Sequence, residues 1–397
     1  MVTKWDEQYA GAGLVLALRP YFARGTRPAG DASTKHLTYG GICSIVQIDG
    51  LPGKGVFGMD DVRYGGQAGS PVMGKGGKRG ISGSTFKIIA VITMLIDHIA
   101  AVILERQIIA EGFRTLDRTS TQAVNDWLAA HGALYWGCVA MRMIGRLGFP
   151  IFCFLLVEGF QRTGNVKKYA LRLGAFALIS EIPFNLAVTG KCFCFDYQNV
   201  FFTLLIGLWA LCAFRFFGRY DTAADGRDLP RALRMTLVVT GVAAATALVL
   251  ICVPEAGGHG ARALSCLAAV AACFAFYGRK KGGRQLQTIC ADLTVMGLFM
   301  ALAEFLRTDY AGTGVLAISA MYLFREKKVY AMLAGCAVLT SMGVNEAASF
   351  LAVVPAALYN GERGLKMKYF FYGFYPVHLL LLYLAAVLSG LGGVALF

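Results

Sequence analysis

The sequence predicts an all-α integral membrane protein, a polytopic helical bundle of about ten or eleven transmembrane helices whose N-terminus lies inside. Of the 397 residues, 56% are hydrophobic and only 16% are charged, and the mean hydropathy is +0.56. Soluble domains rarely combine these values, whereas polytopic membrane proteins commonly do. From residue 86 onward, apolar runs recur with short polar breaks between them, and every second break is rich in Lys and Arg.

Residues 1–80 differ from the rest of the chain. They are rich in Gly and contain no apolar stretch with a sustained period. One interpretation is a disordered, basic cytoplasmic tail, because too little apolar surface is available to offset the entropy of ordering. The other is an extension upstream of a true start at Met73, since a short basic leader runs from there into the first helix. Residues 81–397 are expected to form one transmembrane domain.

The first predicted helix, Phe86–Leu104, is apolar at almost every position and is long enough to cross a bilayer core of about 30 Å. Asp97 and His98 nevertheless lie side by side in its second half, with Thr93 one turn earlier. A charged group at such a depth costs roughly 2.5–3.5 kcal/mol, so membrane helices carry one only where it faces a bundle interior or a pathway. The pair therefore marks a candidate functional site.

The later apolar runs predict the other helices, and the ninth and tenth of the series are short enough to be half-spans or re-entrant segments. The predicted ranges are 138–160, 169–188, 200–217, 234–253, 261–278, 288–306, 312–324, 329–343, 346–359 and 369–389.

Loop charge predicts the orientation. The net charge of +14 would suggest nucleic-acid binding in a soluble protein, but here it reflects basic loops on the cytoplasmic side, and no nucleic-acid partner is expected. The intervening breaks, such as Glu105 to Asp126 and the one that holds Asp309 and Tyr310, are expected outside. The basic segments contain Arg162, Lys167 and Lys168; Arg215 to Arg234; Arg279 to Arg284; Arg325 to Lys328; and Arg363 to Lys368.

The second predicted helix carries Arg142 and Arg146 four residues apart, and hence on one face. Arg146 lies too deep for easy snorkelling, so a buried role is expected, with Asp97 as its counter-ion. His98 then has the chemistry of a general base.

Polar residues in later helices admit two interpretations. Glu181 and Asn185 share a face of the third helix, and Asn199 and Thr203 repeat this spacing in the fourth. They are either hydrogen-bonding contacts between helices or, in the case of Glu181, part of the site. His378, in the last helix, is one more titratable group inside the membrane. The eleven Cys residues show no metal-ligand spacing, so no metal is expected.

Six stretches together resemble the TraX family, membrane proteins linked to N-terminal acetylation of conjugative pilin. They occur in family order between Phe86 and Leu382, with 211–300 similar only as generic spans. The stretches read FKIIAVITMLIDHI, IGRLGFPIFCFLLVEGF, KKYALRLGAFALISEIPFN, NVFFTLLIGL, DYAGTGVL and YNGERGLKMKYFFYGFYPVHLLLL. TraX proteins are in turn similar to membrane acyltransferases that use a membrane-embedded His and cytosolic acyl-CoA.

The resemblance implies a multi-pass acetyltransferase of the bacterial cytoplasmic membrane, with acetyl-CoA or another acyl-CoA as donor substrate and no tightly bound cofactor. Its acceptor would be an amine or hydroxyl group of a pilin-like protein, a glycan or a peptide. His98 would be the base, with Asp97, Arg146, Arg142 and Glu181 completing the catalytic set, and the arginines would meet the thioester oxygen or a CoA phosphate. The cations expected to attract the nucleotide phosphates are Arg162, Lys167, Lys168 and Arg172.

Two other classes of function remain open. Asp97, His98, Arg146, Glu181 and His378 are also the residue types of a proton relay in a proton-coupled transporter, although the spans show no internal repeat of the kind frequent in transporters. Alternatively, the polar groups only connect helices of an assembly protein.

Overall fold

The computed structural model describes residues 79–222, 230–252, 259–281, 283–365, 368–394 and 396. These residues belong to one compact unit, and within them the extended pairing is limited to two isolated bridges. The all-helical fold predicted from the sequence is therefore confirmed. The predictions about residues 1–80 and about Met73 fall outside the described residues, apart from Arg79 and Gly80.

Eight helical runs of the described part are about as long as a membrane span, and three are shorter. Seven of the long ones meet the length and hydropathy of a membrane-crossing helix, and α10 has a similar length of 23 residues. The elements are α3 (Gly83–Ile99), η2 (Ala100–Leu104), α4 (Glu105–Ala110), α5 (Thr121–Gly145), α6 (Gly148–Arg162), α7 (Val166–Thr189), α8 (Val200–Thr222), α9 (Arg231–Cys252), α10 (His259–Lys281), α11 (Gly283–Phe305), α12 (Ala311–Leu323), α13 (Lys328–Thr340), η3 (Val344–Ala352), α14 (Val353–Leu358) and α15 (Lys368–Leu388).

The difference from ten or eleven full spans lies in α12, α13 and η3–α14. The first two have 13 residues each, about 20 Å at 1.5 Å per residue, which is too short for the apolar core of a bilayer. All the predicted apolar runs are helical, but these three reach only part of the way across. Such short elements are tolerated at membrane depth because the surrounding protein covers them.

The first helix is longer than predicted. Ser82 caps α3 by accepting a hydrogen bond from the Thr85 amide, and α3, η2 and α4 then continue as one run of 28 residues, 83–110. Glu105 and Arg106 are therefore buried in α4, not placed in an outer loop as predicted. The guanidinium of Arg106 donates one hydrogen bond within the same helical run, to the carbonyl of Val102 at 3.1 Å.

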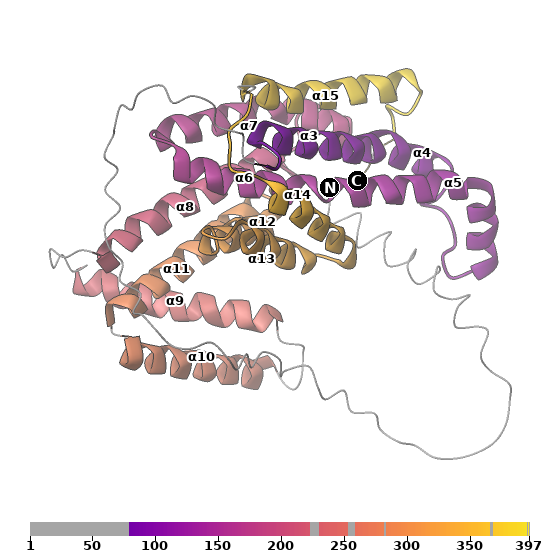
Figure 1. Ribbon diagram of the computed structural model, residues 1–397. Helices are drawn as coiled ribbons and strands as arrows, with labels where there is room; N and C mark the ends of the chain where they lie inside the picture. Colours follow the sequence, from indigo (N-terminus) through magenta and orange to yellow (C-terminus); the bar gives the residue numbers. More distant parts are fainter. Residues whose placement is uncertain are drawn as a thin grey trace, which may run out of the picture. The chain divides into compact units, whose positions relative to one another are not determined.

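The second helix also begins earlier than predicted, at Thr121 rather than near 138. It is broken at Arg146 and Leu147, where the backbone turns between α5 and α6. Figure 1 shows α3 and α4 running beside α5 and α6, with α15 next to α7, and both sets of neighbours are in contact. The break lies beside the middle of α3 and so positions residues of both helices near Asp97.

The basic loops meet at one end of the bundle. Ile81 bridges to Tyr359, Lys328 donates to the Tyr359 carbonyl at 2.7 Å, and Arg162 donates to the Gly361 carbonyl at 3.0 Å. We call this the basic end. The leader and the loops after α6, α12 and α14 thus lie together, in agreement with the orientation that the charge pattern predicts.

The segments between the basic loops meet elsewhere. Gln198, between α7 and α8, bridges to Thr308, between α11 and α12. Near the end of the chain, the Val394 carbonyl accepts a hydrogen bond from Arg106 at 2.9 Å. These segments are the ones predicted to lie outside, so the alternation of the loops holds at both ends.

The helices α13 and η3–α14 form a re-entrant hairpin. Lys328 begins α13 at the basic end, and Tyr359, directly after α14, returns to the same end. The turn at 341–343 lies between them, and η3 packs against α5 and α6. The hairpin therefore carries polar residues from a basic-end loop into the interior of the bundle.

This hairpin predicts the accessibility of its tip. Ser341 lies in the turn, and a Ser341→Cys variant should remain unlabelled by a membrane-impermeant maleimide added outside intact cells, since the two short elements end within the membrane. Lys191→Cys, in the loop between α7 and α8, is the labelled control, with Cys192 and Cys194 replaced by Ser in both proteins. Equal labelling rates would mean that the two elements are full spans.

Candidate functional site

Two histidines from opposite ends of the described chain are in direct contact. Nδ1 of His98 in α3 lies 2.6 Å from Nε2 of His378 in α15, and the rings stack with centroids 4.9 Å apart. Nδ1 of His378 lies 2.7 Å from the Phe374 carbonyl, which can only accept, so this nitrogen carries a proton. In the neutral pair, Nε2 of His378 then accepts from Nδ1–H of His98. This leaves Nε2 of His98 as the unprotonated nitrogen.

The local backbone around both histidines departs from a regular α-helix. The π-helical segment η2 begins two residues after His98, and α15 contains Pro376 two residues before His378. A π-helical turn changes the direction of side chains and is frequent at functional sites, while Pro removes one backbone hydrogen bond of the helix. Sequence alone predicted both histidines to be inside the membrane but not their contact, because 280 residues separate them.

Asp97 pairs with Arg142, not with Arg146 as predicted. Nη1 of Arg142 lies 2.7 Å from Oδ2 of Asp97, and the arginine side chain is 2% exposed. The contact depends on Gly145, one turn along α5: a Cβ there would lie 2.2 Å from Oδ1 of Asp97. The glycine thus allows α3 and α5 to approach closely enough for the ion pair.

Arg146 instead pairs with Glu346 of the re-entrant hairpin. Its Nε lies 3.0 Å from Oε1 of Glu346, and the two side chains are 2% and 0% exposed. The prediction failed because it treated Arg142 and Arg146 as neighbours on one regular helix, whereas α5 ends at Gly145. Glu346 was missed, although an acidic residue within an apolar run is itself a signal of a site inside the membrane.

A small cavity of about 50 Å³ lies beside these residues. Asp97 and His98 line it together with Asp309 and Tyr310, so the last two are not at the outer surface as predicted. Tyr310 is buried and stacks on Phe149 with ring centroids 3.6 Å apart. The short length of α12 explains the difference, because this helix begins inside the bundle and not at its outer edge.

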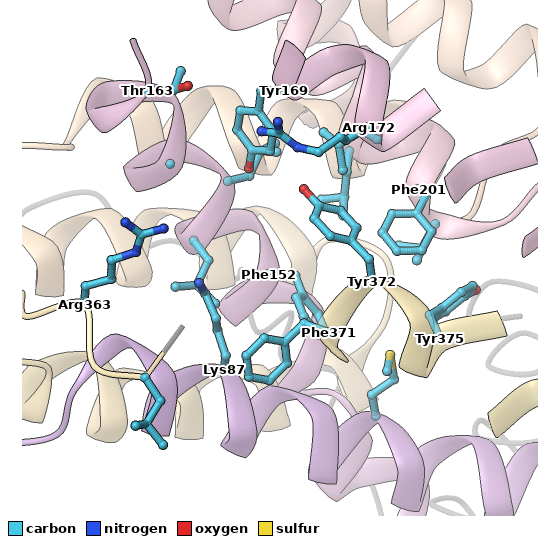
Figure 2. Close-up of a pocket in the computed structure, with 18 residues that line it drawn as sticks. Lys87, Phe152, Thr163, Tyr169, Arg172, Phe201, Arg363, Phe371, Tyr372 and Tyr375 are labelled. Carbon is cyan, nitrogen blue, oxygen red and sulfur yellow. The ribbon is translucent and has the colours of Figure 1, made fainter. Parts of the chain in front are cut away.

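A larger cavity of about 280 Å³ adjoins the small one, since Met94, Phe152, Val200 and Tyr375 line both. In Figure 2, Arg363 and Lys87 lie toward one side of it and Phe201 and Tyr375 toward the other, with Arg172 turned toward Tyr169. The other lining residues are largely apolar or aromatic.

The cations of this cavity differ from those predicted. Of the four expected phosphate-binding residues, only Arg172 lines it. Arg162 pairs with Glu158 at 2.7 Å and is 54% exposed, and Lys167 and Lys168 are exposed in the first turn of α7. Lys87 and Arg363 complete the cationic lining. Both were overlooked: Lys87 because it follows directly on the start of an apolar run, and Arg363 because it was counted only as a loop charge.

Glu181 lies away from both cavities and joins helices. It accepts hydrogen bonds from Asn185 at 3.4 Å and from the side chain of Asn199. Thr203 donates to the backbone carbonyl of Asp309. The bond between Asn185 and Glu181 lies within α7. The bonds of Asn199 and Thr203 fit the interpretation of polar contacts between elements, since they join α7 to the start of α8 and α8 to the loop that carries Asp309. Within the described part of the chain, no three His, Cys, Asp or Glu side chains are grouped as a metal site.

Comparison with known proteins gives two matches. A family model described as TraX protein matches residues 82–215 and 209–386. The chain is also similar to the probable fimbrial assembly protein FimC, serogroup H1, of Dichelobacter nodosus, with 32% identity over 142 residues. That alignment covers 34% of this chain and 47% of FimC, so the chain spans about half the length of this relative. No solved structure matches.

The close approach at Gly145 predicts a specific loss of stability. Gly145→Ala should destabilise the protein by about 1–3 kcal/mol, because the added methyl group overlaps Asp97 and displaces its ion pair. Gly137→Ala is the matched control on the same helix, where a Cβ meets nothing within 4 Å. Thermal unfolding in detergent measures both, and equal melting temperatures for the two variants would contradict the packing described.

The buried pair of Arg146 and Glu346 predicts a larger effect. Glu346→Ala should cost about 3–5 kcal/mol, since it leaves a guanidinium buried without its counter-ion. The control Asp196→Asn, which breaks an exposed pair with Arg307 of 2.6 Å, should cost less than about 1 kcal/mol. Denaturant titration in mixed micelles compares the two, and the double variant Arg146→Met/Glu346→Met should recover most of the loss. A double variant as unstable as Glu346→Ala would contradict the role of the unpaired charge.

Proposed function

The chain belongs to the TraX family, and from this premise we propose that it is a membrane-bound acyltransferase. It moves an acetyl or other acyl group from cytosolic acyl-CoA to an amine or hydroxyl acceptor at or across the bacterial cytoplasmic membrane. The observation that carries the proposal is the pair of His98 and His378 beside two adjoining cavities, the larger of which has Arg363 of the basic end in its lining. A donor entering from the basic end and a base inside the membrane are what such a transfer requires.

In the proposed reaction, Nε2 of His98 accepts the proton of the acceptor N–H or O–H group. The acceptor atom forms a bond to the thioester carbonyl carbon, the C–S bond breaks, and the CoA thiolate leaves with the proton that His98 returns. His378 orients the His98 ring through the 2.6 Å contact. It also stabilises the protonated state of His98 for as long as the proton is held.

Asp97 lines the small cavity, and its proposed role is to act on the acceptor or on charged His98. Arg142 and Arg146 do not line either cavity, so their proposed role is to position Asp97 and the hairpin, not to bind the thioester oxygen. Tyr310 and Tyr375 also line the small cavity, and in the proposal the hydroxyl group of one of them supports the developing oxyanion. Glu181 is a positioning residue.

The acceptor belongs to the other side of the site. The name of the relative FimC refers to fimbrial assembly, which favours a pilin-like protein over a glycan or peptide. Asp309 and Tyr310 line the small cavity, and their loop bridges to the segment before α8 at the end opposite the basic loops. In the proposal, the acceptor reaches His98 past this loop while the donor enters from the basic end.

His98 provides the decisive test. With purified protein and labelled acetyl-CoA, His98→Ala should lower acyl transfer or slow thioester hydrolysis by about 10²-fold or more, the usual contribution of a general base. His131→Gln is the control, since this histidine lies in α5, with its ring tilted against Trp127, and lines neither cavity. Both variants must show wild-type elution and melting. A folded wild-type protein without binding or turnover of acetyl-CoA would overturn the proposal in favour of a proton-coupled transporter.

A further inference from the structure

Three cationic side chains line the larger cavity. Lys87 comes from α3, Arg172 from α7 and Arg363 from the segment before α15, and the described residues that line the cavity include no carboxylate. Lys87 and Arg363 lie toward the same side of the cavity (Figure 2). Glu158, whose charge acts on Lys87, is already engaged by the Tyr359 hydroxyl at 2.7 Å and by Arg162. Three cations in the lining of one cavity, with no carboxylate beside them in that lining, are typical of a site for a phosphate group.

Lys87 and His98 are on the same face of one helix. Eleven residues separate them, which is close to three full turns of an α-helix. Met94, seven residues after Lys87, lines both cavities on the same face. The helix therefore fixes the distance along its axis from Lys87 to His98 at about 16 Å.

The wall between these two points suits a long, thin and partly polar chain. Tyr169, Phe201, Tyr372 and Tyr375 contribute aromatic surface to the cavity. Arg172 lies over the Tyr169 ring, with the guanidinium carbon 5.9 Å from its centroid, and it hydrogen-bonds to Tyr372. The rings of such side chains provide apolar contact for a bound chain, and the hydroxyl groups of the tyrosines can form hydrogen bonds with its polar groups.

We propose that Lys87, Arg172 and Arg363 bind the phosphate at the head of the phosphopantetheine arm of acyl-CoA. The spacing of Lys87 and His98 along α3 then places the thioester of the acyl-CoA at His98. This proposal rests on the proposed acyl-CoA-dependent function and names its donor site. The arm, when extended, spans a distance of this order. The cavity thus selects a ligand with a phosphate at one end and a thioester at the other.

Binding measurements on the full chain test the phosphate site. The protein is placed in nanodiscs of zwitterionic lipid and titrated with CoA, 4′-phosphopantetheine and pantetheine. Wild type should bind the first two at least tenfold more tightly than pantetheine, and Lys87→Gln, Arg172→Gln and Arg363→Gln should each remove about tenfold of that difference. Pantetheine itself should bind the wild type and the variants alike. The matched control, Lys167→Gln/Lys168→Gln, removes two exposed charges of the same region and should stay within twofold of wild type.

Three results would overturn the phosphate site. The first is equal binding of phosphopantetheine and pantetheine by the wild type. The second is a loss in the Lys167/Lys168 control as large as in Lys87→Gln, which would assign the effect to the overall charge of the basic end. The third is unchanged CoA binding in the three variants, together with less anionic phospholipid co-purified with the variants than with the wild type, which would assign the cavity to a lipid headgroup.

Kinetics separate the failure of this proposal from the failure of the function. The Lys87→Gln enzyme should show a raised KM for acetyl-CoA with kcat within threefold of wild type, and unfolding is excluded by its melting temperature. An active enzyme with an unchanged KM in all three variants would overturn the phosphate site and leave the function standing. A protein that binds CoA through these residues but transfers no acyl group would overturn the proposed function and leave the phosphate site standing.

Discussion

The burial of charge in an apolar bundle is the constraint on which the rest of the structure depends. Arg142 and Arg146 are both 1% exposed, and neither would be tolerated in this environment without a nearby carboxylate. The need for two acids brings α3 against α5 through Asp97 and draws the re-entrant hairpin into the bundle through Glu346. This packing also determines the position of His98, because His98 directly follows Asp97 in α3.

The hairpin and the short α12 give the molecule its asymmetry across the membrane. A full span at either place would fill the bundle interior with apolar side chains. Elements that reach only part of the way bring polar loops, with Tyr310 and Glu346, to the depth of His98. The interior of the protein is thereby divided into a wide cavity lined in part by Arg363 from the basic end and a narrow one beside the polar loops.

The features predictable from sequence are those that depend on hydropathy and local spacing. The apolar runs, the grouping of the basic loops and the intramembrane position of Asp97, His98 and His378 all follow from these. The ion-pair partners did not follow, because they depend on the break between α5 and α6. Gly145, Gly148 and Pro150 surround this break in the sequence, but they do not show which carboxylate each arginine meets. Nor could hydropathy distinguish a short helix covered by protein from a short span, so Asp309, Tyr310 and Glu346 were missed.

The order in which these partners leave the ribosome has a consequence for biogenesis. Asp97 precedes Arg142 by 45 residues, so this pair can form as soon as the first two helical runs are in the membrane. Arg146 must wait 200 residues for Glu346, roughly 10–40 s at ordinary rates of chain elongation. During that interval the Arg146 guanidinium lacks the carboxylate of Glu346. The hairpin that carries Glu346 therefore enters the bundle late. His378 is synthesised after Glu346, so the contact between the two histidines can form only once the carboxylates of both ion pairs have been made.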